Sequence, residues 1–426
     1  MEHVPCGLHG ASVGLVLPAH MRPSHCAFLH LPASHSGSGL ATGAGVAFHG
    51  VPSSLHLVRA ARLAIGDGGR YVLAISAATA AWVTRRSQHR LVNATSRKAV
   101  ETVPPAVGGA IPQDSVNKLS ELLASALEAE AAEKPAEKLM EAEEAARKFV
   151  IFAGNGFSSF GTGSKVEKRP YTDEEMTEAG VDAAKVLATD DIVSGLRRTL
   201  LIALAAATFA FIVLLKPTAA FINAVGGAII IGVVIDQLVS QGSLQALFFD
   251  TLARRVDTDY EKRVAEHEAG CFLVGYLMGI LPKGYSLSAW DCLFGFETTN
   301  IRAGSVFCAA EFQREVKTGK LTGKSLDVFV CIRLAGIVQE YLCYGQARTG
   351  LYNIQAVQTL FRSVKFEERR KRDETRWAVL NVASLLQRHK EVCKDLVKAM
   401  ENGLPTAQCL ALIESRIAGK DEDEAS

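Results

Sequence analysis

The stretch RVAEHEAGCFLVGYLMGI occupies residues 263–280 and sets the fold of the C-terminal part of the chain. Its apolar residues recur at helical spacing as far as Pro282, so it predicts a single helix. Residues four apart lie one above the other on a helix. His267 and Cys271 would therefore present two donor atoms to one point, and Glu268 would lie beside them.

This trio is close to a known catalytic arrangement. In the usual His-Glu-x-x-His helix, two imidazoles bind zinc and the glutamate takes a proton from the metal-bound water. Here Cys271 stands where the second histidine would be. A thiolate can bind zinc, but it makes the metal a poorer acid toward its water. The alternative is that His267 is a buried histidine that is simply packed and hydrogen-bonded.

Two further blocks accompany the helix, GYSLSAW at residues 284–290 and LAGIVQEYLCYG at residues 334–345. In this order, the three blocks resemble the peptidase domain of FtsH-type ATP-dependent zinc metalloproteases. They are more similar still to the ATPase-lacking FtsH-like proteins of cyanobacteria and plastids. The run at 396–414 is similar to the closing helices of that domain, so the resemblance covers about residues 240–415.

The resemblance implies a third metal ligand, a carboxylate shortly after a Thr-Gly turn. In this chain the turn is Thr349-Gly350, and the place falls on Asn353 or Ile354, with no acidic residue until Glu367. A catalytic zinc ion needs three protein ligands and a water molecule. The family's site therefore maps onto three metal-ligand positions and one catalytic position, namely His267, Cys271 and Asn353 as ligands and Glu268 as the base.

Three hypotheses follow from this ligand set. The first is a catalytically impaired, membrane-anchored peptidase-like protein, which acts as a scaffold or regulator in membrane protein quality control. The second is an active zinc metalloendopeptidase, and the third an unrelated structural membrane protein. The first two imply protein clients or an active protease as partner. In the first, zinc would be bound weakly or not at all. An ATP site is not expected, because Gly319–Ser325 has one residue too few for a phosphate-binding loop.

Two apolar stretches predict a membrane anchor. Residues 200–215 contain no charge, and residues 219–235 are apolar apart from Asn223. Each is near the lower length limit for crossing a bilayer, and the Lys216-Pro217-Thr218 turn between them predicts a helical hairpin at 197–240. Arginine pairs on both sides would keep both ends on one face of the membrane. Close approach of the two helices would use the glycines of this segment, Gly226, Gly227 and Gly232. A buried hairpin of a soluble protein is the alternative.

The first 100 residues have the composition of a targeting leader. Only Glu2 and Asp67 are acidic there, whereas nine of the eleven histidines lie in this part of the chain. A disordered, acid-poor leader of this kind is typical of organelle transit peptides, and we expect an organelle membrane, with a plastid favoured. The nine cysteines form no disulfide-like or structural-zinc spacing, which indicates a reducing or redox-neutral compartment.

The remaining segments complete the predicted architecture, which is mainly α with a small β element. Residues 113–148 predict solvated acidic helices, and residues 149–196 a linker that is flexible around 154–164. The peptidase-like domain would span 250–418, with a strand pair between Gly284 and Phe307. Its first helix would start at a Thr258–Glu261 capping box. Further helices are expected at 326–343, 351–364, 366–400 and 407–417, before an acidic, disordered tail at 419–426. Residues 367–374 combine four acidic and four basic side chains whose fields largely cancel, so they predict a solvated helix face and no nucleic-acid site.

Overall fold

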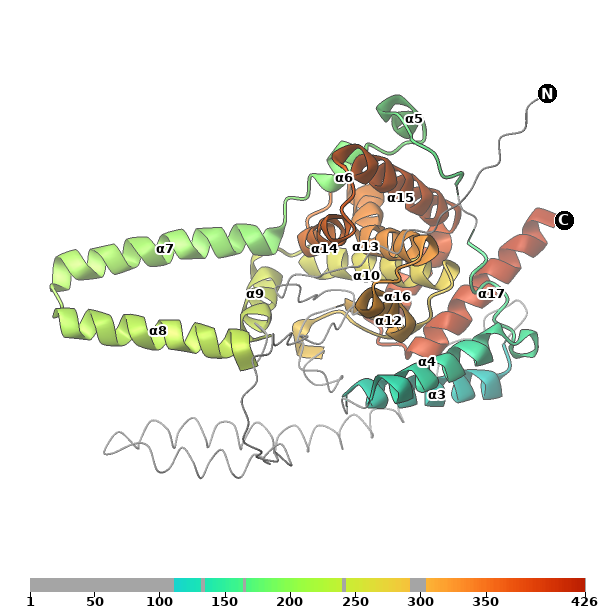
Figure 1. Ribbon diagram of the computed structural model, residues 1–426, viewed down its shortest axis with the longest axis horizontal. Helices are drawn as coiled ribbons and strands as arrows, with labels where there is room; N and C mark the ends of the chain where they lie inside the picture. Colours follow the sequence, from blue (N-terminus) through green and yellow to red (C-terminus); the bar gives the residue numbers. More distant parts are fainter. Residues whose placement is uncertain (1–110, 132–134, 164–165, 240–242, 292–303, 426) are drawn as a thin grey trace, which may run out of the picture. The chain divides into compact units, whose positions relative to one another are not determined.

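The computed structural model describes residues 111–131, 135–163, 166–239, 243–291 and 304–425 (Figure 1). It is mainly helical, with one small two-stranded sheet. The predicted leader, residues 1–100, lies outside the described residues. The elements in chain order are α3 (Gln113–Ala131), α4 (Ala136–Ile151), η1 (Ala153–Asn155), α5 (Asp173–Glu178), α6 (Ala183–Leu187), α7 (Ile192–Leu215), α8 (Ala219–Val239), α9 (Ser243–Val256), α10 (Tyr260–Leu277), β1 (Pro282–Ser286), β2 (Gly304–Phe307), α12 (Ala310–Thr318), α13 (Gly323–Tyr344), α14 (Leu351–Ser363), α15 (Glu368–Arg388), α16 (Lys390–Glu401) and α17 (Thr406–Ala425).

The core of the helical domain is the pair α10 and α13. Residues of α10 from His267 to Leu277 are all buried, and α13 contributes an unbroken buried run from Val328 to Glu340. Small residues set the distance between the two helices, because a Cβ atom added to Gly270 would lie 2.7 Å from the Cβ of Gln339. The helix predicted from residues 263–280 is thus confirmed as α10.

The start of α10 differs from the prediction. The helix begins after Asp259, whose side chain makes no capping hydrogen bond, so the predicted Thr258–Glu261 capping box is wrong. The side chain of Glu261 instead accepts a hydrogen bond from Arg254 of α9 at 2.8 Å. The carboxylate is therefore used to join α9 to α10.

The sheet pairs β1 with β2 in antiparallel register, with Tyr285 opposite Ser305 and Ser286 opposite Gly304. The register shifts between Pro282 and Gly284, which is consistent with a proline that cannot donate to the ladder. All four residues of β2 are buried, and this strand packs on α10. The predicted β element is confirmed, and it brings Ser305 against the centre of the domain.

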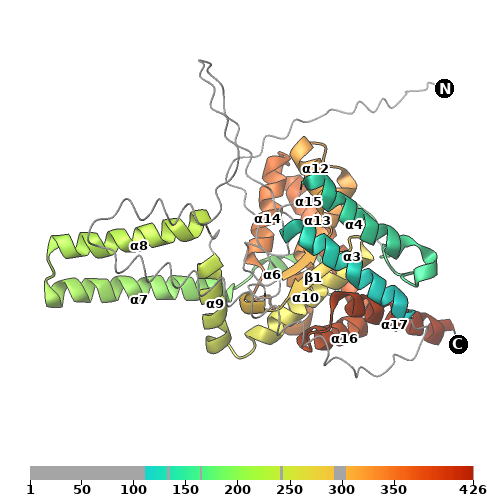
Figure 2. The same cartoon turned by 90° about the horizontal axis from the view of Figure 1, so that it is seen from below.

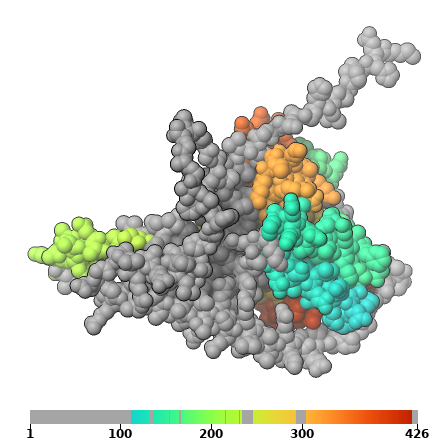
Figure 3. Space-filling view, turned by 60° about the horizontal axis from the view of Figure 1, so that its bottom comes forward, coloured from blue at the N-terminus to red at the C-terminus, as the bar shows by residue number. Residues whose placement is uncertain are grey.

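The acidic helices α3 and α4 are packed on the domain, so the prediction that they are solvated is wrong. Lys283 of β1 is buried and lies 2.9 Å from Glu130 of α3 and 2.5 Å from Glu143 of α4. Glu143 also accepts a hydrogen bond from the backbone N–H of Ala310 at the start of α12. Figure 3 shows α4 and α12 side by side on one face of the molecule. Two acidic side chains of this segment, Glu130 and Glu143, therefore pair with a buried lysine.

The glycine-rich segment at residues 154–163 is hydrogen-bonded to the helical domain, contrary to the predicted flexible linker. Gly163 donates its backbone N–H to the carbonyl of Leu277, at 2.9 Å. The buried carboxylate of Glu414 in α17 accepts the backbone N–H and hydroxyl of Ser159, at 2.9 and 2.8 Å. This segment thus joins the end of α10 to the C-terminal helix.

Helices α7 and α8 form the predicted hairpin, running side by side in Figures 1 and 2. Lys216 takes a left-handed conformation, with φ of 44°, at the turn between them. In the described part of the chain, one helix, Ile192–Leu214, is long and apolar enough to cross a membrane, and Ala219–Ile229 is a shorter apolar helix. The expected role of Gly226, Gly227 and Gly232 in close packing is wrong, because a Cβ atom added at any of them would meet nothing within 4 Å.

The C-terminal helices follow the prediction with two differences. The predicted helices at 326–343 and 351–364 correspond to α13 and α14. The single helix expected at 366–400 is divided at His389 into α15 and α16. The last helix, α17, continues to Ala425, where a disordered tail was expected.

Candidate functional site

The imidazole of His267 lies between α10, α13 and α14 and is held at both ring nitrogens. Its Nδ1 is 2.9 Å from Oε1 of Glu340, so the ring donates Nδ1–H to that carboxylate. Glu340 also accepts the hydroxyl of Thr349 and, at 2.9 Å, the backbone N–H of Arg348. The carboxylate fixes the tautomer in which Nε2 carries the lone pair.

Two glycines hold the ring in one orientation. A Cβ atom added to Gly336 of α13 would lie 2.2 to 2.4 Å from three ring atoms of His267. Gly350, with φ of 87°, approaches from the start of α14, where an added Cβ would lie 2.8 Å from Cε1 of the ring. The ring therefore fills the space that two side chains would otherwise occupy, and it cannot rotate without moving the backbone of either element.

Asn353, the expected third ligand, faces the nitrogen that a metal would need. Its amide Nδ2 lies 3.1 Å from Nε2 of His267. The side-chain oxygen of Asn353 accepts a hydrogen bond from Arg333 at 3.1 Å, which fixes the amide orientation. An N–H group is a donor without a lone pair to offer, so Asn353 engages His267 as a hydrogen-bond donor.

Arg333 brings a permanent positive charge to this centre. Its side chain is fully buried, and its guanidinium carbon lies 5.1 Å from the centre of the Phe329 ring. Arg333 is also near enough to Glu268 to favour the charged form of that carboxyl. A buried carboxylate requires such compensation, because removing its charge from water is costly.

Glu268, the predicted base, is directed at β2. Its Oε2 accepts the backbone N–H of Ser305 at 2.6 Å and the Ser305 hydroxyl at 2.9 Å. Burial raises the pKa of Glu268 above its ordinary value, although the neighbouring His267, the Ser305 hydrogen bonds and Arg333 act in the opposite direction. In this arrangement the carboxylate joins α10 to the sheet.

Cys271, the predicted second ligand, is buried on the same face of α10 as His267. Its thiol lies 3.6 Å from the carbonyl oxygen of Ile332 in α13. The thiol is therefore a weak donor in the contact between α10 and α13, as expected for a small buried cysteine.

As arranged, these side chains do not present a zinc-binding set. Nε2 of His267 faces an amide donor, the thiol of Cys271 faces a carbonyl, and the oxygen of Asn353 faces a guanidinium. Within the ranges that the structure describes, no group of three or more histidine, cysteine, aspartate or glutamate side chains is gathered as a metal site. Tetrahedral zinc requires lone pairs that converge on one point, and here the converging groups pair with one another.

Of the four predicted site residues, the structure joins His267 to Asn353 by a hydrogen bond, whereas Glu268 is bonded to Ser305 and Cys271 faces the carbonyl of Ile332. Further partners come from residues outside the predicted set. Arg333, Thr349 and Ser305 had no predicted role, and Glu340 appeared only as part of a similar block. One signal was available, because Arg333 is the only charged residue between Asp327 and Glu340. A single charge in a buried helical run indicates an internal partner.

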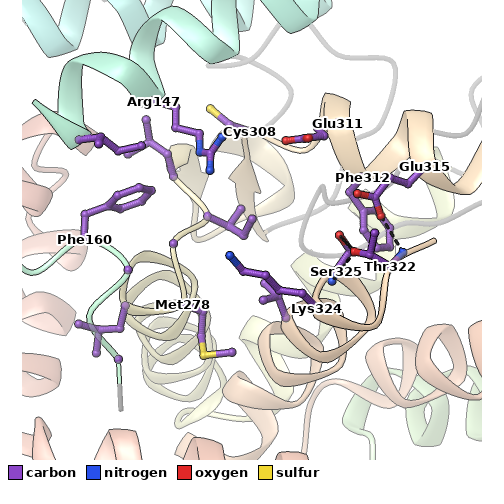
Figure 4. A pocket seen from close by; sticks show the side chains of 18 residues that line it. Arg147, Phe160, Met278, Cys308, Glu311, Phe312, Glu315, Thr322, Lys324 and Ser325 are labelled. Atoms are coloured by element: carbon purple, nitrogen blue, oxygen red, sulfur yellow. Dashed lines mark hydrogen bonds between the residues drawn. The ribbon is translucent and has the colours of Figure 1, made fainter. Parts of the chain in front are cut away.

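A cavity of about 530 Å³ lies elsewhere, between α4, α12, the C-terminal end of α10 and the N-terminal end of α13 (Figure 4). It begins at Leu277, ten residues along α10 from His267, or about 15 Å by the helical rise. Its rim mixes Arg147 and Lys324 with Glu311 and Glu315. Glu315 also accepts the backbone N–H of Thr322 at the start of α13, at 3.0 Å. The segment Gly319–Ser325, which is similar to a phosphate-binding loop, would bind an anion at the start of α13. A backbone N–H at this helix start is already bonded to an acidic side chain.

Comparison with other proteins adds no assignment to this geometry. No known protein family, no curated protein and no solved structure matches the chain.

Proposed function

We propose that this chain is a membrane-anchored protein with an FtsH-like peptidase domain that does not hydrolyse peptides and acts as a scaffold or regulator. In this proposal the domain binds protein clients or an active protease in membrane protein quality control. The centre around His267 has a structural task there, which is to hold α10, α13, α14 and β2 in fixed positions.

One observation carries the proposal: the engagement of His267 at both nitrogens. Glu340 holds Nδ1, and the Asn353 amide donates to Nε2, the nitrogen expected to bind zinc. Arg333 then supplies beside Asn353 the positive charge that a metal ion would have contributed. Glu268 uses its carboxylate to bind the backbone N–H and the hydroxyl of Ser305, which supports a structural part for the residue expected to be the base.

Membrane anchoring by the α7–α8 hairpin is the second part of the proposal. Its support is the exposure of large apolar side chains along α7, which include Leu201, Ile202, Leu204, Phe209 and Leu214 at exposed fractions of 55 to 79%. An exposed apolar surface of this length is unfavourable in water and favourable in a bilayer.

The test is metal analysis of the full chain, purified in detergent and incubated with zinc, together with casein hydrolysis. We expect substoichiometric zinc and no hydrolysis, with the unmodified chain and Glu268→Gln giving the same result. Cys271→His alone should not restore hydrolysis, because it leaves the Asn353–Arg333 pair in place. Stoichiometric zinc, with hydrolysis that Glu268→Gln abolishes, would overturn the proposal in favour of an active zinc metalloendopeptidase.

Hydrolysis that persists in Glu268→Gln would come from a contaminating protease. A matched control shows whether an effect of Glu268→Gln is specific to the centre. Glu261→Gln alters an exposed glutamate of the same helix and should leave both zinc content and hydrolysis unchanged. A change in Glu261→Gln equal to that in Glu268→Gln would mean that neither effect reports on the centre.

A further inference from the structure

Helix α9 has one face directed outward. Phe248 and Arg255 are exposed on it, with the half-buried Thr251 and Leu252 between them. These four residues have the i, i+3, i+4, i+7 spacing of one helical face. On the opposite face, Phe249, Asp250 and Ala253 are buried.

The indole of Trp290 extends this face. Its Nε1–H donates to Oγ1 of Thr251 at 2.9 Å, and the residue is 42% exposed. The preceding residue is also tied to α9, because the backbone N–H of Ala289 donates to Asp250 at 3.0 Å. An aromatic ring is thus held at Thr251, on the same face as Phe248 and Arg255, with its polar atom paired and part of its surface exposed.

Helix α9 lies next to the base of the hairpin. Ala253 of α9 belongs to a buried cluster against which Val193 and Leu196 of α7 pack. The exposed side chain of Arg197 lies over the Phe249 ring, with 5.3 Å between the guanidinium carbon and the ring centre. The apolar run of α7 begins three residues later, at Leu200. Figures 1 and 2 both place α9 across the end of α7 and α8 that is remote from their turn.

We propose that the outward face of α9, together with Trp290, rests on the lipid headgroup region where the hairpin enters the bilayer. The inference depends on the proposed membrane anchoring and adds a second, peripheral contact to it. Tryptophan and other aromatic rings favour the membrane–water interface, where the ring is sheltered and its polar atom remains hydrated or paired. Arg255 on this face and Arg197 and Arg198 near the start of α7 are exposed and would meet anionic headgroups.

The occupant of the face is a lipid surface because α9 lies across the base of the exposed apolar hairpin (Figures 1 and 2). Arg254 is not part of it, since it pairs with Asp250 and Glu261 inside the domain. The chemistry at the face is aromatic and basic, which is the composition of helices that lie in a bilayer interface. The predicted consequence is a fixed orientation of the domain against the membrane.

Tryptophan fluorescence of the full chain tests this proposal. In Trp82→Phe/Trp377→Phe, Trp290 is the only tryptophan. The protein is reconstituted into phosphatidylcholine vesicles, with or without phosphatidylglycerol, whose acyl chains carry bromine at shallow or deep positions. We expect a blue shift of the emission and a loss of fluorescence that is larger with shallow bromine than with deep bromine.

Trp377 provides the matched control. It is 2% exposed, and its Nε1–H donates to the carbonyl of Val166 at 3.1 Å. Trp82→Phe/Trp290→Phe, which keeps Trp377, should show no bromine quenching. If Trp377→Phe fails to fold, the same contribution is obtained as the difference between Trp82→Phe and Trp82→Phe/Trp290→Phe. Phe248→Ser should reduce the quenching of Trp290, because it removes the neighbouring aromatic contact with lipid.

Two failures can be told apart. Chains that do not float with the vesicles would refute the membrane anchoring itself. Chains that float but show no quenching of Trp290 would overturn the interfacial contact alone and leave the face to a protein partner. Equal quenching with and without phosphatidylglycerol would remove the arginines from the proposal, which would then be wrong in its electrostatic part.

Discussion

The helix pairs α10–α13 and α7–α8 are both apolar and both contain several glycines, yet they have opposite surroundings. In α10–α13, Gly270, Gly275 and Gly336 are packed against Gln339, Phe307 and His267, and charged side chains are buried with their partners. In α7–α8 the glycines meet nothing, and the apolar side chains are exposed. The difference teaches that apolar composition alone does not determine whether a helix is buried by other protein segments. Residue size and buried charges determine that.

The largest expected effect tests the buried charge of the first pair. Arg333→Met removes the cation beside Glu268 and the donor to Asn353, and leaves both groups buried. We expect a loss of about 3 to 5 kcal/mol in the free energy of unfolding. Denaturant unfolding of the full chain in detergent, followed by the fluorescence of the buried Trp377, measures it.

Arg369→Met is the control for this change, because it removes an exposed arginine. Its effect should stay within about 0.5 kcal/mol. Equal destabilisation by the two changes would show that the buried guanidinium has no special part in the centre.

The next effect concerns the exposed pair. Phe209→Arg places a charge near the middle of the apolar run of α7 and should oppose membrane insertion by about 2.5 to 3.5 kcal/mol. Carbonate extraction should then release a larger share of the chain. Thr199→Arg, beside Arg197 and Arg198 at the end of that run, should remain in the membrane. If neither variant is released, α7 does not cross the hydrocarbon layer.

Glycine substitutions compare the two pairs directly. Gly336→Ala would bring a Cβ atom to 2.2 Å from His267, a ring held on both sides, and should cost about 1 to 3 kcal/mol. Gly323→Ala in the same helix and Gly227→Ala in α8 meet nothing within 4 Å. Both should be neutral or stabilising by up to about 1 kcal/mol. Thermal unfolding of the three variants measures this, and a harmless Gly336→Ala would mean that the His267 ring is mobile.

The smallest effect is at the end of α13, where the buried contact reaches solvent. Burial, followed by the neighbouring Glu266, raises the pKa of the Cys343 thiol to about 12. Because the thiolate is the reactive form, alkylation of Cys343 at pH 8 should be more than about tenfold slower than that of an ordinary exposed cysteine. The rate should rise with pH up to that pKa.

Peptide mapping after timed iodoacetamide treatment measures the rate at this cysteine. Glu266→Gln should accelerate it, because the change removes the negative charge near Sγ. Glu261→Gln, on the same helix, should not. An unchanged rate in Glu266→Gln would leave burial as the whole cause.

Sequence periodicity and composition were sufficient to predict that most of the helices and strands exist. The helix at 263–280, the strands near Gly284 and Phe307, and the hairpin around Lys216–Thr218 all follow from local patterns that no other segment alters. The prediction that the acidic helices α3 and α4 are solvated is wrong, because Glu130 and Glu143 pair with Lys283, more than 130 residues away in the chain. Charge patterns specify that a side chain needs a partner, and the fold alone brings the partner to it.

The same division applies to the candidate site. By itself the sequence determined that His267, Glu268 and Cys271 share a helix and that no carboxylate follows Thr349-Gly350. Only the tertiary structure decided what meets His267, namely Glu340 on one nitrogen and the Asn353 amide, oriented by Arg333, on the other. The physical reason is that helical spacing is a local property of the backbone, whereas the pairing of buried donors, acceptors and charges depends on three helices and a strand that meet only in the folded chain.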